Sequence, residues 1–305
     1  MISTDENLKL NTSETADLIS MLRVLFDKRK PIIFFTSLIT LCSIIVSLWL
    51  PNIYTSEAVL LVREQDNNSI QGQAPTLGGL QAFSGLNFKA GNEELSKRAN
   101  EGIYIIRSRQ FYKMLVDKYN YIPPIMASKS FDHSNNKLIY SGAYDENLNV
   151  WADGKQPSYE DGYNEYSDIV SVSRNVKTGF LTLRVDHLSP YFAQELASNI
   201  IDEVNARMLS SDMSDANQSL AYLTEISQTP TYSETKSAIA KLIERKLNVL
   251  VVSSIHKDYV FKYIDPPSLP VIKTGPPRAI IVLISLMISF ITSSIYFLAI
   301  PYFKK

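Results

Sequence analysis

Two long stretches without any charged side chain frame the sequence. They comprise residues 32–50 (IIFFTSLITLCSIIVSLWL) and 279–302 (AIIVLISLMISFITSSIYFLAIPY). The hydrocarbon core of a bilayer is roughly 30 Å thick, and a helix needs about 20 residues to cross it. The first stretch is longer than the apolar region of a signal peptide, and no small-x-small cleavage pattern follows it. Both stretches are therefore predicted to be uncleaved transmembrane helices.

Basic residues near the ends of these stretches predict the orientation, because Lys and Arg concentrate on the cytoplasmic side of a membrane. Three basic residues lie near the ends that face the central segment 51–278: Arg63, Lys273 and Arg278. Six lie near the ends that face the N- and C-termini: Arg23, Lys28, Arg29, Lys30, Lys304 and Lys305. We therefore expect cytoplasmic tails over residues 1–31 and 303–305. Residues 51–278 are expected to form a domain outside the cytoplasm.

Short alternating or β-branched runs predict four strands in this outer domain. The first covers residues 54–62 and follows the first apolar stretch directly. Residues 169–173 and 180–185 flank a Thr178-Gly179 turn, which predicts a hairpin. Residues 259–264 form the last predicted strand before the chain returns to the second apolar stretch.

Apolar residues at three- and four-residue spacing predict two helices in the first half of the domain. One begins at Glu93 and reaches about residue 106. The other uses Ser108 as its N-cap, reaches about Tyr119 and is expected to end before Pro123-Pro124.

Two further helices are predicted in the second half. Ser189 is the N-cap and Pro190 the first-turn residue of a helix with an apolar residue at every fourth position: Phe192, Leu196, Ile200, Val204 and Met208. We expect it to continue in broken form to Pro230. Thr231-x-x-Glu234 is a capping box for a helix whose apolar face comprises Ile239, Leu242, Ile243, Leu247 and Leu250. The predicted fold is α+β, with extended amphipathic helices and two transmembrane anchors.

Three segments lack these periodicities. Residues 64–92 are rich in Gly, Gln and Asn, which predicts a loop. Residues 129–168 are polar and rich in tyrosine and include Trp151. Aromatic residues beside carboxylates occur at sugar-binding surfaces and in ordinary surface insertions, and we favour the second interpretation.

In residues 264–278, five prolines between positions 266 and 277 exclude a helix or a central strand. They predict a stiff, extended connector.

Composition excludes several classes of function. The formal net charge of the 305-residue chain is −1, so it lacks the basic surface that nucleic acid requires. The single cysteine, Cys42, lies in the first apolar stretch, so no intramolecular disulfide is expected in the outer domain. The sequence has no P-loop, no G-x-S-x-G elbow and no H-E-x-x-H pair. Its three histidines are expected to be satisfied surface residues: His133, His187 and His256. We predict that the protein is not an enzyme and holds no catalytic residue, cofactor or metal.

The order of these features resembles the Wzz polysaccharide chain-length determinants of Gram-negative inner membranes, also called polysaccharide co-polymerases. The resemblance is carried by residues Asp17 to Lys30, Leu77 to Leu80 with Ser84-Gly85, Pro157 to Tyr159, Lys177 to Leu183 with His187 to Pro190, and Phe261 to Pro266 leading to Pro270 and to Pro276 to Ala279. Some members carry a fused cytoplasmic tyrosine kinase, for which the short C-terminal tail leaves no room. The chain therefore resembles the kinase-free class associated with O-antigen.

The resemblance implies a non-catalytic, ring-shaped homo-oligomer in the periplasm. Such a ring sets the modal length of the polysaccharide, here lipopolysaccharide O-antigen, that the Wzy polymerase makes from lipid-linked units, and it could contact the growing polymer. Candidate motif positions are Gly78, Gly79, Ser189, Pro190, Pro266, Pro270, Pro276 and Pro277. The alternative is a periplasmic ligand-binding or adaptor module of an envelope transport system.

Overall fold

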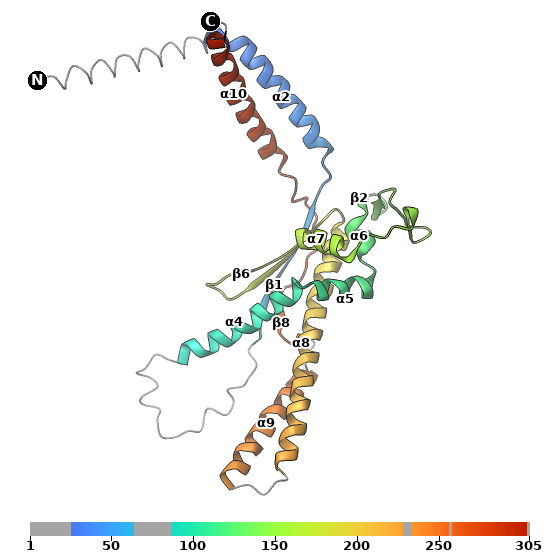
Figure 1. The fold of residues 1–305 in the computed structure, drawn as a ribbon, viewed down its shortest axis with the longest axis vertical. Coiled ribbons are helices and arrows are strands. Elements are labelled where there is room, and N and C mark those ends of the chain that lie inside the picture. The colour runs from blue at the N-terminus through green and yellow to red at the C-terminus, as the bar shows by residue number, and fades with distance from the viewer. Residues whose placement is uncertain (1–25, 64–86, 228–232, 256–257, 304–305) are drawn as a thin grey trace, which may run out of the picture. The chain divides into compact units, whose positions relative to one another are not determined.

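The computed structural model describes residues 26–63, 87–227, 233–255 and 258–303. The chain divides into two compact units (Figure 1). The helix-pair unit comprises Met1–Asn52 and Thr274–Lys305, and the central unit comprises Ile53–Lys273. The described residues form both helices and sheets, and the predicted α+β class is confirmed.

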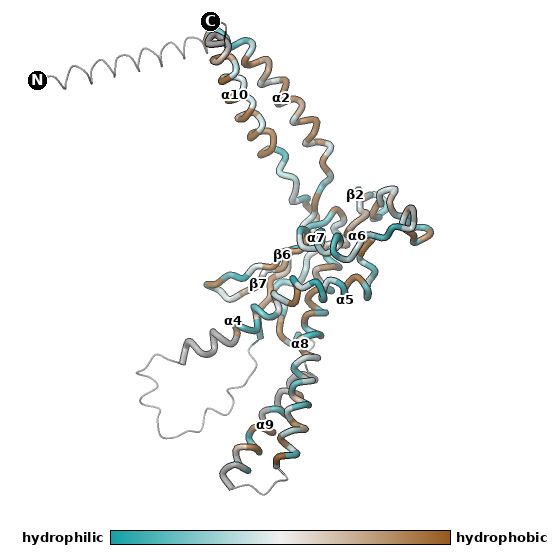
Figure 2. The backbone as a smooth tube through the Cα atoms, viewed as in Figure 1, coloured by the Kyte–Doolittle hydropathy of each residue, from teal (hydrophilic) through white to brown (hydrophobic). Residues whose placement is uncertain are grey.

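The helix-pair unit contains α2 (Arg29–Trp49) and α10 (Arg278–Phe303). The two helices lie side by side and run antiparallel, because the rings of Phe35 and Phe297 are 5.9 Å apart while Ser47 and Ala279 line one groove at the opposite end. Most of their large apolar side chains are exposed, and Figure 2 shows hydrophobic residues along both helices. Both helices are long and apolar enough to cross a membrane.

The central unit is built on a four-stranded antiparallel sheet in the order β6-β7-β1-β8. Its strands are β1 (Tyr54–Val62), β6 (Val170–Arg174), β7 (Leu181–His187) and β8 (Phe261–Asp265). The four strands and the β6–β7 hairpin agree with the sequence prediction. Gly179 has φ +75°, a conformation that glycine adopts without strain.

One face of this sheet forms the core together with α8 (Pro190–Ser227). Alternate residues of β1 and β7 are buried, as the two-residue period of a strand requires. The predicted apolar stripe of α8 covers them, and each of its residues is at most 6% exposed: Phe192, Leu196, Ile200, Val204 and Met208. Burying one such side chain stabilises the fold by about 1.5–3 kcal/mol.

Shorter elements surround this core. The helices are α4 (Asn87–Ile106), α5 (Arg109–Tyr119), α6 (Ile122–Met126), α7 (Tyr159–Ile169) and α9 (Ser233–Ile255). Two small hairpins pair β2 (Ser128–Asp132) with β3 (Lys137–Tyr140), and β4 (Tyr144–Asp145) with β5 (Val150–Trp151). A 3-10 turn, η2 (Ala152–Gly154), follows β5.

Several boundaries differ from the sequence prediction. The segment 87–92 was expected to be loop but is the start of α4. The helix α5 is ended by Asn120, whose φ is 55°, and not by the two prolines. Those prolines instead lie in the first turn of α6, where a missing N–H is tolerated.

The largest difference concerns α8, which is a continuous helix of 38 residues and not a broken one. Its second half lacks a strong apolar stripe, but α9 packs along it and supplies the partner that the local sequence does not reveal. The predicted capping residue Thr231 lies outside the described residues.

A single buried amide holds the start of β8 against α8. The Asn205 side chain accepts hydrogen bonds from the backbone N–H groups of Val260 and Phe261 at 3.1 and 2.8 Å. Its Nδ2 donates to the carbonyl oxygen of Phe261 at 2.9 Å. Asn205 is 3% exposed, so its side chain satisfies backbone groups that would otherwise be buried without partners. The last strand is thereby fixed where the chain turns toward the connector.

Candidate functional site

The proline-rich connector is attached to the central unit at two backbone carbonyl groups. Ser56 of β1 donates from Oγ to the carbonyl oxygen of Ser268 at 2.9 Å. Gln194 of α8 donates from Nε2 to the carbonyl oxygen of Pro267 at 3.0 Å. Residues 266–273 form neither helix nor strand, as the prolines predict. Side chains of β1 and α8 therefore hold a segment that cannot join the sheet.

The start of α8 is built around Ser189, as its predicted N-cap role requires. The Ser189 Oγ accepts a hydrogen bond from the N–H of Phe192 at 3.2 Å. The Ser189 N–H in turn donates to Nδ1 of His187 at 3.0 Å. Because Nδ1 accepts, the ring proton is on Nε2, which donates to the carbonyl oxygen of Pro124 at 2.9 Å. One imidazole thus joins the end of β7, the first turn of α8 and α6.

His187 was expected at the surface, and this expectation was wrong. His187 is 6% exposed, and the centre of its ring lies 4.5 Å from the centre of the Phe192 ring. Burial lowers the pKa of the His187 imidazole from 6.5 to about 4, since a charged ring loses its hydration there. The imidazole is therefore neutral at physiological pH and acts as a structural hydrogen-bonding group.

In the helix-pair unit, the start of α10 is tied to the segment that follows α2. The carbonyl oxygen of Pro277 accepts from the N–H groups of Ile280 and Ile281 at 3.0 and 3.1 Å. The Arg278 Nη2 donates to the carbonyl oxygen of Leu50 and to Oδ1 of Asn52, both at 3.1 Å. Arg278 therefore connects two chain segments that are more than 200 positions apart in sequence.

The predicted motif positions divide into three groups. One group lies where α8 and the connector meet in the central unit: Ser189, Pro190, Pro266 and Pro270. The second precedes α10 in the helix-pair unit: Pro276 and Pro277. The third lies outside the described residues: Gly78 and Gly79. Sequence reasoning missed three residues because their partners are 63 to 212 positions away: Ser56, His187 and Gln194.

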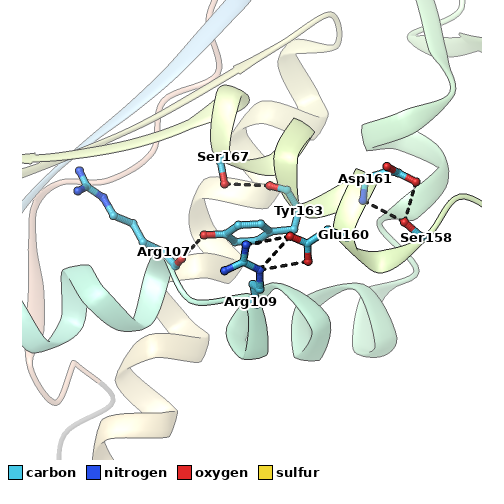
Figure 3. Close-up of polar contacts among 7 residues, drawn as sticks. All are labelled: Arg107, Arg109, Ser158, Glu160, Asp161, Tyr163 and Ser167. Atoms are coloured by element: carbon cyan, nitrogen blue, oxygen red, sulfur yellow. Dashed lines mark hydrogen bonds and ion pairs between the residues drawn. The ribbon is translucent and has the colours of Figure 1, made fainter.

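A second polar cluster joins the end of α4 with α5 and α7 (Figure 3). The Arg109 Nη2 and Nε donate to the carboxylate of Glu160 at 2.8 and 3.1 Å. The same guanidinium lies 4.9 Å from the centre of the Tyr163 ring, and the Tyr163 hydroxyl donates to the carbonyl oxygen of Arg107 at 2.6 Å. The hydrogen bond from Arg109 lowers the pKa of Glu160. The cluster therefore holds the end of α4, α5 and α7 together.

Other acidic groups of the central unit have structural partners too. Asp212 accepts from Arg98 Nη2 at 2.5 Å and from the Tyr259 hydroxyl at 2.7 Å, which fastens α4 to α8. Within the described parts of the chain, no group of three His, Cys, Asp or Glu side chains could hold a metal ion. The described polar groups are thus arranged to hold elements together.

Comparison with known proteins finds a family model that is similar to the first part of the chain. Residues 14–119 match the family model described as "Wzz: Chain length determinant protein". The matched segment includes α2, β1, α4 and α5. This match agrees, over the residues that it covers, with the resemblance inferred from the sequence.

Comparison with solved structures finds similar chains at low sequence identity. A "full-length bacterial polysaccharide co-polymerase" is 14% identical, with 93% of this chain and 97% of that chain covered and a TM-score of 0.38. A fragment of WzzB, a polysaccharide co-polymerase from Salmonella Typhimurium, is 10% identical, with 73% of this chain and 100% of that chain covered and a TM-score of 0.24. No curated protein matches the sequence. The likeness to the family therefore rests on residues 14–119.

Proposed function

We propose that this protein sets the length of lipopolysaccharide O-antigen as a non-catalytic, homo-oligomeric scaffold in the Gram-negative inner membrane. In this proposal the central unit lies in the periplasm and both termini lie in the cytoplasm. The scaffold acts on the Wzy polymerase while that enzyme extends the lipid-linked polymer. The match of residues 14–119 to the chain length determinant family is the observation that carries the proposal.

The arrangement of α2 and α10 supports the proposed topology. The two helices are antiparallel, so the first turn of α2 and the last turn of α10 are at the same end of the helix-pair unit. The basic residues that flank this end favour the cytoplasm. The chain enters the central unit at β1, directly after α2, and leaves it through the connector that precedes α10. A domain joined to the membrane at two points is suited to stand as one subunit of a ring.

The contacts of the described residues support a scaffold over an enzyme. Asp212, Glu160 and His187 each hold two or more elements together through hydrogen bonds. A scaffold needs such fixed geometry across its subunit, whereas catalysis needs a group poised to exchange a proton or form a bond.

Deletion of the gene tests the proposal. Lipopolysaccharide from the deletion strain is separated on a gel beside lipopolysaccharide from the parent and from the complemented strain. We expect the parent to have a modal cluster of bands, the deletion strain to lose it and complementation to restore it. An unchanged ladder would contradict the proposal. Loss of length control in a different surface polysaccharide would overturn the O-antigen assignment alone.

A further inference from the structure

Strand β3 and the β4–β5 hairpin of the central unit line an open cleft. Its volume is about 760 Å³, which lies within the roughly 300–1,000 Å³ typical of sites for small molecules. The lining extends from Lys137 to Ala152 and thus includes β3, β4 and β5. Two-stranded hairpins are marginally stable alone, so these elements need support from the rest of the unit. Leu138 and Trp151 supply it, because both pack against the hydrophobic core.

Aromatic rings form one wall of the cleft. The Tyr144 ring lies 5.2 Å from the Tyr140 ring and 5.1 Å from the Trp151 ring, measured between ring centres. All three residues are partly buried and line the cleft. Tyr144 and Trp151 are also register partners in the β4–β5 ladder, and the Tyr144 hydroxyl donates to Oδ1 of Asn149. The wall is therefore held in place before any ligand arrives.

Polar groups surround this wall. Lys137 Nζ and Glu146 Oε2 form an ion pair of 3.1 Å between β3 and the β4–β5 turn, and both side chains remain partly exposed. Oδ1 of Asp145 accepts hydrogen bonds from the backbone N–H groups of Asn147 and Leu148, and these bonds fix the turn beside the cleft. Burial and the nearby Glu146 carboxylate raise the pKa of Tyr140, so its hydroxyl stays protonated and able to donate.

The combination of these groups selects a class of ligand. An aromatic wall favours apolar C–H groups, and a rim of two carboxylates, a lysine and a side-chain amide favours hydroxyl groups that both donate and accept. The charged residues of the lining carry one positive and two negative charges, which disfavours phosphate and other strongly anionic groups. A pyranose ring has apolar C–H faces and a circumference of hydroxyl groups, and it satisfies each of these conditions.

We infer that the cleft between β3, β4 and β5 binds neutral pyranose units of the polysaccharide, with the mutually tilted rings of Tyr144 and Trp151 at the apolar C–H groups of the sugar and Glu146 at its hydroxyl groups. The identity of the polymer rests on the function proposed above, whereas the binding of a sugar rests on the cleft itself. A site of this kind would let each subunit hold the growing chain directly.

Binding to the full-length protein tests the inference. The sequence contains two tryptophans, Trp49 in α2 and Trp151 in the cleft, so a Trp49→Phe background makes Trp151 the only indole reporter. The protein is kept in a zwitterionic detergent, because the headgroup of a maltoside detergent is itself a sugar. The probe is a set of short oligosaccharides released by mild acid from the lipopolysaccharide of the source strain. We expect a saturable change in Trp151 fluorescence and protection of the indole from acrylamide.

Three variants in this background decide between a site and a non-specific signal. Tyr144→Ala removes part of the aromatic wall and should abolish saturable binding. Glu146→Gln changes a partly exposed carboxylate without risk to the core and should weaken binding by about tenfold. Tyr104→Ala is the matched control, because Tyr104 is 74% exposed on α4 and outside the cleft lining. It should leave the binding curve unchanged.

Two results would overturn the inference: no saturable change in the Trp49→Phe protein, or binding that Tyr144→Ala and Glu146→Gln leave unaltered. If circular dichroism shows that Tyr144→Ala does not fold, the binding curve of Glu146→Gln alone decides whether the cleft binds the oligosaccharides. The outcome is separable from that of the proposed function. Loss of the modal bands on deletion without oligosaccharide binding refutes the cleft and keeps the function. Oligosaccharide binding together with an unchanged ladder on deletion refutes the proposed function and keeps the cleft as a sugar-binding site.

Discussion

Acidification should weaken the central unit through one buried side chain, His187. In the folded protein its Nδ1 accepts from Ser189 and its Nε2 donates to Pro124, so the ring is held neutral. A second proton would have to occupy Nδ1, where it would face the Ser189 N–H in a buried site. The fold therefore disfavours the imidazolium that forms readily in the unfolded chain.

The size of the effect follows from the pKa. Burial lowers the pKa of His187 from 6.5 in the unfolded chain to about 4 in the fold. The stabilisation is complete above pH 6.5 and is lost as the pH falls toward 4, because the unfolded chain binds the proton first. A difference of about 2.5 pKa units corresponds to about 3 kcal/mol of unfolding free energy. For a unit of this size, that loss lowers the melting temperature by about 6–12 °C.

The assay is thermal unfolding of the full-length protein in detergent, followed by far-ultraviolet circular dichroism at pH 7 and pH 4. Carboxylates also titrate over this range, so the quantity of interest is the difference between variants. Wild type should lose about 6–12 °C more than His187→Gln between the two pH values. The exposed-histidine control, His133→Gln, should retain the full wild-type loss. An equal loss in wild type and His187→Gln would refute the reasoning.

Three further predictions follow from packing and from the connector. Gly102→Ala would place a Cβ 2.2 Å from the ring of the buried Phe261 and should cost about 1–3 kcal/mol of unfolding free energy in denaturant titration. Leu196→Asp puts a carboxylate at a fully buried position of α8, so the protein level and the modal bands should both be lost in immunoblots and gels. Combined Pro276→Ala and Pro277→Ala loosens the segment before α10. It should broaden the band distribution while crosslinking still detects assembled protein.

The parts of the fold that were predictable have strong local signals. In the strand at 54–62 every second residue is buried, and its observed bounds equal the predicted ones. Ser108 and Ser189 were identified as N-caps because a side-chain oxygen before an apolar periodic run satisfies free N–H groups. The apolar stripe of α8 was found from its four-residue repeat.

The parts that were missed depend on distant partners. Helix α7 buries little besides Gly162 and Tyr166, so it lacks the periodicity that reveals a helix, although Ser158 with Asp161 is a start signal that could have identified it. The unbroken length of α8 depends on packing against α9. In the candidate site, the contacts of Gln194 with the connector cannot be read from local sequence, because Pro267 is 73 positions away.

The central claim is that this chain determines polysaccharide length without taking part in the chemistry of polymerisation. The most direct measurement is the length distribution of O-antigen in a strain that lacks any chain length determinant and has a fixed level of polymerase. The strain receives the wild-type gene, the Leu196→Asp gene or an empty vector. Wild type should convert an unregulated ladder into a modal cluster while the total amount of polymer stays constant, and the other two should not. An unregulated ladder with wild type, or a change in total polymer without a modal cluster, would contradict the account.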